Sequence, residues 1–283
     1  MTILPHTHKL ALSGIALFLD VDGTLLELAA APQDVSVPDD LRERLRALFL
    51  AGGGAIALVS GRAIMDLDAL FAPLTLPSAG LHGFEHRGVS GTCRRRPLPS
   101  EAALEAARGA MLDFAGRHAG ARVEDKRFAL ALHYRGAPQL EEAALTAMRG
   151  IAARAGGELE VQRGKMVVEL RPTGATKGEA VAAFLGEAPF AGRLPVFVGD
   201  DLTDEAAFEL VNQRGGLSVL VGGPRPTAAR ARLADVAAVR DWLAQLQSEP
   251  DTALRRLSRP RHALSGSEDP SRARPGARRR GQA

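Results

Sequence analysis

The sequence predicts an α/β protein with a doubly wound parallel-sheet core and a smaller inserted α/β domain, whose antiparallel sheet has one open face. In the first and last parts of the chain, short apolar runs alternate with helical patterns, which is typical of a parallel sheet covered on both faces. These apolar runs lie in the segments 15–20, 55–60, 195–200 and 217–221. In the middle of the chain, apolar and polar residues alternate one by one, which predicts a sheet covered on one face only.

The first part of the core begins with the run IALFLDVDGTLL at 15–26, and its apolar half is a predicted buried strand. Residues 38–53 form a predicted helix, because two aspartates cap its start, leucines recur at helical spacing and a glycine run ends it. A second strand, AIALVSG, follows at 55–61, and GRAIMDLDALF at 61–71 returns to a helical pattern. This order predicts neighbouring parallel strands joined by helices.

The same rhythm returns after residue 172 in TKGEAVAAFLGEA, PVFVGDD, TDEAAFELVNQ and LSVLVGG. Between these two parts, RFALALHYR at 127–135 and KMVVELRP at 165–172 alternate apolar and polar side chains, and each follows a helical pattern. We therefore expect an inserted domain whose open sheet face can close over the core. The expected segments are a core domain, first part, at 1–99, the inserted cap domain at 100–172, the second part of the core at 173–250, and a disordered tail rich in Arg, Pro and Ser at 251–283.

Charge and composition exclude several classes of protein. The pI is near 9.5, but residues 251–283 hold nine Arg and three acidic residues, so the first 250 residues are slightly acidic. The basicity therefore belongs to the tail, and we expect no nucleic-acid partner. A single cysteine, Cys93, excludes an intramolecular disulfide, and no apolar stretch is long enough for a membrane span. We expect a cytoplasmic protein, with a monomer as the default state.

Polar side chains stand where the predicted core strands end, which is where parallel sheets bind ligands. They are Asp20 and Asp22 after the first strand, Ser60 after the second, and Asp200 and Asp201 after a later one. Two carboxylates about 4 Å apart repel each other by ~4 kcal/mol at an effective dielectric constant near 20, so a cation must lie among them. Oxygen ligands without clustered Cys or His favour a hard ion, and we expect Mg²⁺.

The motifs DxDGT, SGR, TKG and GDDLTDE occur here in the order found in the haloacid dehalogenase superfamily, which the chain resembles. The longer strings LDVDGTL, VSGR, AGLHGFEHR, FALALHYR, VVELRPTGATKGEA and FVGDDLTDEAAF resemble the trehalose-6-phosphate phosphatase family within it. The resemblance covers residues 15 to 245. It implies a haloacid dehalogenase-like core with a cap, and Mg²⁺-dependent hydrolysis of trehalose 6-phosphate to trehalose and phosphate, the last step of trehalose biosynthesis.

The resemblance also implies roles for the residues at the strand ends. Asp20 is the expected nucleophile, which forms an aspartyl-phosphate, and Asp22 is the expected general acid and base. The metal is expected on the Asp20 carboxylate, the Asp22 backbone carbonyl and Asp200, with Asp201 and Asp204 supporting these ligands. The expected phosphate-binding residues are Gly23, Thr24, Ser60, Gly61, Arg62 and Lys177.

Substrate choice is expected to come from the cap, because the phosphate site is generic. By resemblance, Glu124, Lys126 and Glu169 bind glucose hydroxyls, and His82, Glu85 and Arg87 help to seat the second sugar or the cap. The alternative for Glu124, Lys126 and Glu169 is that they are exposed charged residues of the strands without a function. The alternative for His82 is a purely structural role. Two other functions stay open: hydrolysis of another sugar phosphate, and a catalytically silent sugar-phosphate sensor on the same scaffold. The cap strings disfavour a phosphomutase.

Overall fold

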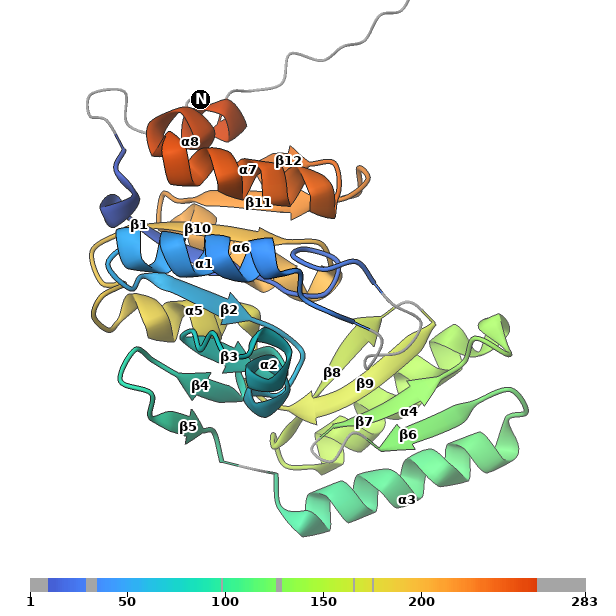
Figure 1. Cartoon of the computed structure of the whole chain (residues 1–283). Coiled ribbons are helices and arrows are strands. Elements are labelled where there is room, and N and C mark those ends of the chain that lie inside the picture. The colour runs from blue at the N-terminus through green and yellow to red at the C-terminus, as the bar shows by residue number, and fades with distance from the viewer. Residues whose placement is uncertain are drawn as a thin grey trace, which may run out of the picture.

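A computed structural model describes residues 10–28, 35–97, 99–125, 129–164, 166–174 and 176–258 of the 283-residue chain (Figure 1). The helices are α1 (Asp39–Ala51), α2 (Ile64–Phe71), α3 (Glu101–Arg117), α4 (Glu141–Arg154), α5 (Lys177–Leu185), α6 (Glu205–Gln213), α7 (Val236–Ser248) and α8 (Pro250–Ser258), with short 3₁₀ turns η1 (Leu12–Gly14), η3 (Leu81–Gly83), η4 (Pro138–Leu140) and η5 (Leu202–Asp204). None of the helices in the described parts of the chain is long and apolar enough to cross a membrane.

The strands form two separate sheets. The core sheet has the order β12-β11-β10-β1-β2-β3-β4-β5 and the second sheet the order β6-β7-β9-β8. The strands are β1 (Ile15–Leu19), β2 (Ile56–Val59), β3 (Ser78–Gly80), β4 (Glu85–Arg87), β5 (Cys93–Arg95), β6 (Arg122–Asp125), β7 (Leu130–His133), β8 (Leu159–Gly164), β9 (Val167–Pro172), β10 (Leu194–Gly199), β11 (Leu217–Val221) and β12 (Ala231–Leu233).

The core sheet is covered by helices on both faces, as the sequence predicts. Along β1, Leu17 and Leu19 point into one apolar cluster with α1, α2, α7 and α8, whereas Ala16 and Phe18 point into another with α5 and α6. All five residues of β1 are buried, because both faces of the strand are covered. The sheet is parallel from β12 to β3, and the antiparallel hairpin β4–β5, which the sequence pattern did not predict, extends one edge.

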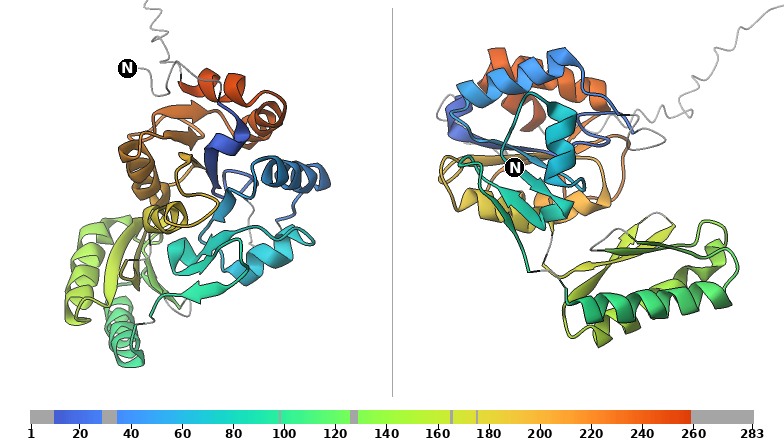
Figure 2. Two further views of the ribbon diagram at one scale, coloured as in Figure 1. Left: turned by 90° about the vertical axis from the view of Figure 1, so that its left-hand side faces the viewer. Right: turned by 60° about the horizontal axis from the view of Figure 1, so that its bottom comes forward.

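The second sheet is antiparallel and lies between α3 and the core (Figures 1 and 2). Leu130 and Leu132 of β7 and Val168 and Leu170 of β9 pack in one apolar cluster with α3 and α4, so these helices cover one face. The intervening residues belong to the other face, as expected from their alternation. This arrangement confirms the predicted fold class, and the separate apolar cluster supports the inserted domain proposed for 100–172.

The prediction of a disordered tail from residue 251 is wrong for its first residues, because they form the helix α8. Ala253 and Leu254 are fully buried in the core cluster, and the Trp242 indole Nε1 donates a hydrogen bond to the Ala253 carbonyl at 3.2 Å. Because arginine is so frequent in residues 251–283, the composition of this tail did not reveal the short amphipathic helix that packs on α7. Residues 259–283 lie outside the described part of the chain.

Candidate active site

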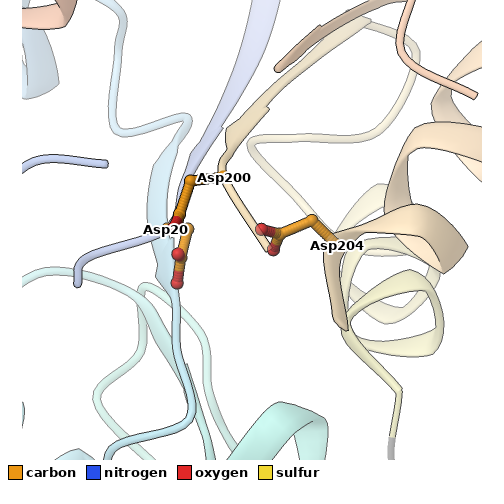
Figure 3. A group of neighbouring side chains, drawn as sticks. All are labelled: Asp20, Asp200 and Asp204. Atoms are coloured by element: carbon orange, nitrogen blue, oxygen red, sulfur yellow. The ribbon is translucent and has the colours of Figure 1, made fainter. Parts of the chain in front are cut away.

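Three aspartates meet at the carboxyl ends of the two central strands. Asp20 follows β1, Asp200 follows the adjacent parallel strand β10, and Asp204 ends the turn η5. One carboxylate oxygen of each lies within 4.8 Å of those of the other two. In Figure 3 the Asp204 side chain points toward Asp20 and Asp200 from the turn beside them. The sequence predicted that Asp20 and Asp200 share a site and that Asp204 supports the ligands, and this role of Asp204 stays a prediction.

Lys177, the first residue of α5, carries the positive charge inside this cluster. Its Nζ lies 2.7 Å from Oδ1 of Asp20 and 2.7 Å from Oδ1 of Asp204, and all three side chains are buried. The helix begins where it does because the Thr176 hydroxyl accepts a hydrogen bond from the Glu179 N–H, and the Glu179 carboxylate in turn accepts from the Thr176 N–H. This capping box fixes the lysine at the start of the helix, next to the strand ends.

Burial governs the ionisation of these groups. It raises the pKa of Asp20 from 3.8 to about 7, and although Lys177 opposes the increase, the nearby Asp200 adds to it. Burial raises the pKa of Asp204 to about 7 in the same way, and it also raises the pKa of Asp200. For Lys177, burial favours the neutral amine, but Asp20 and Asp204 outweigh this effect and raise its pKa. Without a metal, the cluster therefore keeps the Lys177 ammonium charged, while Asp20 and Asp204 lose their protons only as the pH rises through about 7.

Two glycines allow the carboxylates to come this close. Gly23 has a φ of +79°, and a Cβ at this position would lie 2.2 Å from Oδ2 of Asp200. A Cβ at Gly199 would lie 2.4 Å from Cγ of Asp204. The Thr24 hydroxyl donates to Oδ1 of Asp200 at 3.2 Å, and the expected role of Gly23 and Thr24 in turning backbone donors toward the phosphate stays a prediction. Gly23 and Thr24 therefore shape the aspartate cluster itself.

Asp22 lies on the same loop as Asp20 but has a different partner. Its two oxygens accept from Nε and Nη2 of Arg62 at 2.7 and 2.6 Å, in a partly exposed bidentate pair. These hydrogen bonds raise the pKa of Arg62. The sequence predicted both residues at the site but did not predict that they pair with each other. The role of the Asp22 carbonyl as a metal ligand stays a prediction.

The turn after β2 brings Ser60, Gly61 and Arg62 to the same edge of the sheet, as predicted. Ser60 is buried, and its hydroxyl accepts a hydrogen bond from the Arg62 N–H at 3.1 Å. A Cβ at Gly61 would lie 2.9 Å from the His82 ring, so this ring packs directly over the turn. His82 has a left-handed backbone with φ of 57°, an unusual conformation for a residue other than glycine. His82 is thus placed against the predicted phosphate-binding turn.

Two predicted sugar-contacting residues have structural contacts instead, and the structure corrects these expectations. The buried Glu85 carboxylate accepts from the Ile64 N–H at 2.8 Å and from Nε of Arg95 at 2.9 Å. The Arg87 guanidinium donates to both oxygens of Asp68 and is also buried. Both side chains hold the β4–β5 hairpin and α2 together. No local pattern revealed this, because the partners are 10 to 21 residues apart.

Two of the predicted cap residues share a row on the second sheet. Glu124 of β6 and Glu169 of β9 both pair with Ala131 of the intervening strand β7, so they lie on the same face of the sheet. Glu124 is exposed and lies 2.7 Å from Nε2 of His133. Lys126 lies outside the described residues. Asp201, predicted to support the ligands, has an exposed side chain, but its N–H donates to Oδ2 of Asp204 at 2.8 Å.

The α/β core, the cap and the aspartate cluster define a hydrolase of the haloacid dehalogenase type. A phosphatase of the haloalkanoate (HAD) superfamily from Bacteroides thetaiotaomicron has the same fold, with a TM-score of 0.58 at 17% identity, over 88% of this chain and 98% of that one. The family model described as trehalose-phosphatase matches residues 18–237. The chain belongs to this family.

Individual relatives agree with this assignment. The chain is 46% identical to the trehalose-6-phosphate phosphatase of Escherichia coli (strain K12), over 81% of this chain and 85% of that protein. It is also similar to the structure of Aspergillus fumigatus trehalose-6-phosphate phosphatase, with 28% identity and a TM-score of 0.65, over 82% of this chain and 92% of that one. The recognition made from the sequence motifs is thereby confirmed.

Proposed function

We propose that the protein hydrolyses trehalose 6-phosphate to trehalose and phosphate, the last step of trehalose biosynthesis. The observation that carries the proposal is the buried cluster of Asp20, Asp200, Asp204 and Lys177 at the strand ends of a member of the trehalose-phosphatase family. Family membership supports the substrate, and the cluster supports the reaction. The proposed localisation is cytoplasmic, and the monomeric state stays a prediction.

The donor set fits Mg²⁺. The described residues at this point offer carboxylate oxygens from three aspartates, and their charge exceeds that of the single Lys177 ammonium. Asp20 and Asp200 are the proposed ligands of the ion, and Asp204 lies close enough to be a further candidate. When bound, the ion would neutralise the carboxylates and polarise the oxygens of the phosphoryl group.

Asp20 is the proposed nucleophile. In the first step, one of its carboxylate oxygens bonds to phosphorus while the bond from phosphorus to the sugar oxygen breaks, which leaves an aspartyl-phosphate. In the second step, water attacks this phosphorus, the bond to the Asp20 oxygen breaks and phosphate leaves. Attack requires the ionised carboxylate, and Lys177, 2.7 Å away, favours that form. Lys177 and Ser60 are the proposed binding groups for phosphate oxygens.

Asp22 is the proposed acid and base. It gives a proton to the departing sugar oxygen in the first step and takes one from the attacking water in the second. In the structure, Asp22 is paired with Arg62, so proton transfer requires Asp22 to release this partner. The pair is bidentate and only partly exposed, so new contacts of Arg62 with the substrate phosphate would have to offset its loss. Arg62 released in this way could bind the phosphate, as the sequence predicted.

Glu124, Lys126 and Glu169 are the proposed contacts to the sugar hydroxyls. Glu124 and Glu169 lie in one row of the second sheet, on the face opposite α3 and α4, with the small Ala131 between them. Carboxylates accept strong hydrogen bonds from hydroxyl groups, which suits recognition of a disaccharide. Substitution of Glu124 or Glu169 by Gln should therefore raise KM for trehalose 6-phosphate more than it lowers kcat.

The experiment that tests the proposal measures phosphate release from a panel of sugar phosphates, with and without Mg²⁺. The expected result is a preference for trehalose 6-phosphate and activity that requires the metal. Asp22→Asn should lower kcat by a factor of about 10² or more, since a positioned acid and base contributes roughly this amount. Preference for another sugar phosphate would contradict the substrate assignment. Binding of trehalose 6-phosphate without hydrolysis would favour a catalytically silent sugar-phosphate sensor.

A further inference from the structure

The segment after β11 contacts the loop that carries Asp200 and Asp204 through an arginine that the sequence patterns did not single out. Nη2 of Arg225 donates to the backbone carbonyl of Asp201 at 2.8 Å and to that of Asp200 at 3.3 Å. Nη1 of the same guanidinium pairs with Glu205, the first residue of α6. Arg225 therefore links both ends of the turn that contains η5.

Glu205 is the anchor of this contact. Besides Arg225, its carboxylate accepts hydrogen bonds from the Thr227 hydroxyl at 2.8 Å and from the Ala228 N–H at 2.7 Å. Glu205 directly follows Asp204, and the Arg225 and Glu205 side chains are only 23% and 24% exposed, so solvent screens their interaction incompletely. The segment 225–228 is thus held against the start of α6 by several hydrogen bonds that converge on one carboxylate.

We infer that Arg225 is a positioning residue, which holds the backbone of residues 200–201 so that the Asp200 carboxylate stays in the aspartate cluster. The inference rests on the proposed function. A hydrogen bond to the Asp200 carbonyl fixes the peptide plane next to the Cα that carries the Asp200 side chain. The planar guanidinium of Arg225 can donate to this loop and to Glu205 at the same time. The Asp200 carboxylate also packs closely against Gly23, where a Cβ would lie 2.2 Å from its Oδ2. A lysine has a single ammonium group and cannot reproduce the planar fork of donors.

The test compares Arg225→Met and Arg225→Lys with the wild type. We expect the Mg²⁺ concentration that gives half of the metal-induced rise in Tm to increase about tenfold in Arg225→Met, which is roughly the factor for loss of one charge-assisted hydrogen bond. Arg225→Lys should keep the charge and yet show most of the increase. In activity assays, kcat at fixed Mg²⁺ should fall while KM for trehalose 6-phosphate changes little, because the sugar contacts lie in the cap.

Arg230→Met is the matched control, because Arg230 is an exposed arginine on the same segment. It should leave the Mg²⁺ response unchanged. Glu205→Gln provides a second variant: it should shift the Mg²⁺ midpoint in the same direction, and its effect should not add to that of Arg225→Met, since the two residues act as a unit.

A lower Tm with an unchanged Mg²⁺ midpoint in both variants would show a merely structural role and overturn the inference. If the wild type fails to hydrolyse trehalose 6-phosphate, the proposed function fails instead. The Mg²⁺ midpoints are read from unfolding and not from turnover, so they still decide whether Arg225 positions the loop.

Discussion

Replacement of Asp20 by Asn should stabilise the metal-free protein at neutral and alkaline pH while abolishing turnover. Asp20 is almost fully buried, and burial raises its pKa from 3.8 to about 7. The native state therefore keeps a proton that the unfolded chain releases between pH 3.8 and 7. Relative to high pH, the raised pKa of Asp20 adds to the free energy of unfolding. This addition is fully present below pH 3.8 and is lost as the pH rises through 7.

The magnitude follows from this difference of about three pKa units. Each unit corresponds to 1.36 kcal/mol, so ionisation of Asp20 lowers the free energy of unfolding by about 4 kcal/mol above pH 7. In Asp20→Asn the neutral amide removes the cost of ionising a buried carboxyl, and it also removes the repulsion between Asp20 and Asp204. Lys177 keeps Asp204 as an ion-pair partner at 2.7 Å. For a chain of this size, the gain corresponds to a rise in Tm of roughly 10 °C.

The assay is thermal unfolding in EDTA at pH 5 and pH 8, followed by circular dichroism. Asp20→Asn should unfold at a higher temperature than the wild type at pH 8, and the difference should shrink at pH 5. Asp241→Asn, at an exposed carboxylate of α7, is the control and should change Tm little at either pH. A lower Tm for Asp20→Asn at pH 8, or a difference independent of pH, would refute the reasoning.

Three further changes test the site and the core. Gly23→Ala puts a methyl group 2.2 Å from Oδ2 of Asp200 at a positive φ, so calorimetry should show Mg²⁺ affinity reduced by a factor of about 10 or more. Lys177→Met leaves Asp20 and Asp204 without a cation, so denaturant unfolding in EDTA at pH 8 should show a loss of about 3–5 kcal/mol that diminishes at pH 5. Leu254→Ala should lower the free energy of unfolding by about 2–5 kcal/mol if α8 belongs to the core, and an unchanged value would refute that packing.

Much of the core could be predicted because its signals are local. The run that ends at Leu19 is apolar throughout, and this pattern is typical of a strand that is covered on both faces. Parallel strands present their carboxyl ends at one edge, so the meeting of Asp20 and Asp200 followed from strand direction alone. The glycine beside them could also be anticipated, although its reason, the approach of the Asp200 carboxylate, is visible only in three dimensions.

The remaining features depend on contacts between distant residues. The pair Asp22–Arg62 spans 40 positions, and no periodicity encodes such a partner. The hairpin β4–β5 has strands of only three residues, which are too short to show an alternating pattern in the sequence. The inward position of Asp204 did have a signal, because Asp201 and Asp204 have the spacing of a capping box, which turns the second carboxylate back toward the first residue.

The central place of β1 and β10 in the core sheet has a consequence for amide hydrogen exchange. Both strands have neighbours on each side, and their amides can exchange only when the sheet itself opens. Amides such as those of Phe18 and Phe197 should therefore exchange at the rate of global unfolding, whereas the edge strand β5 should exchange through smaller openings. A protein molecule with a frayed β5 edge or a locally melted cap should thus still hold Asp20 and Asp200 in register, ready for the next phosphate ester.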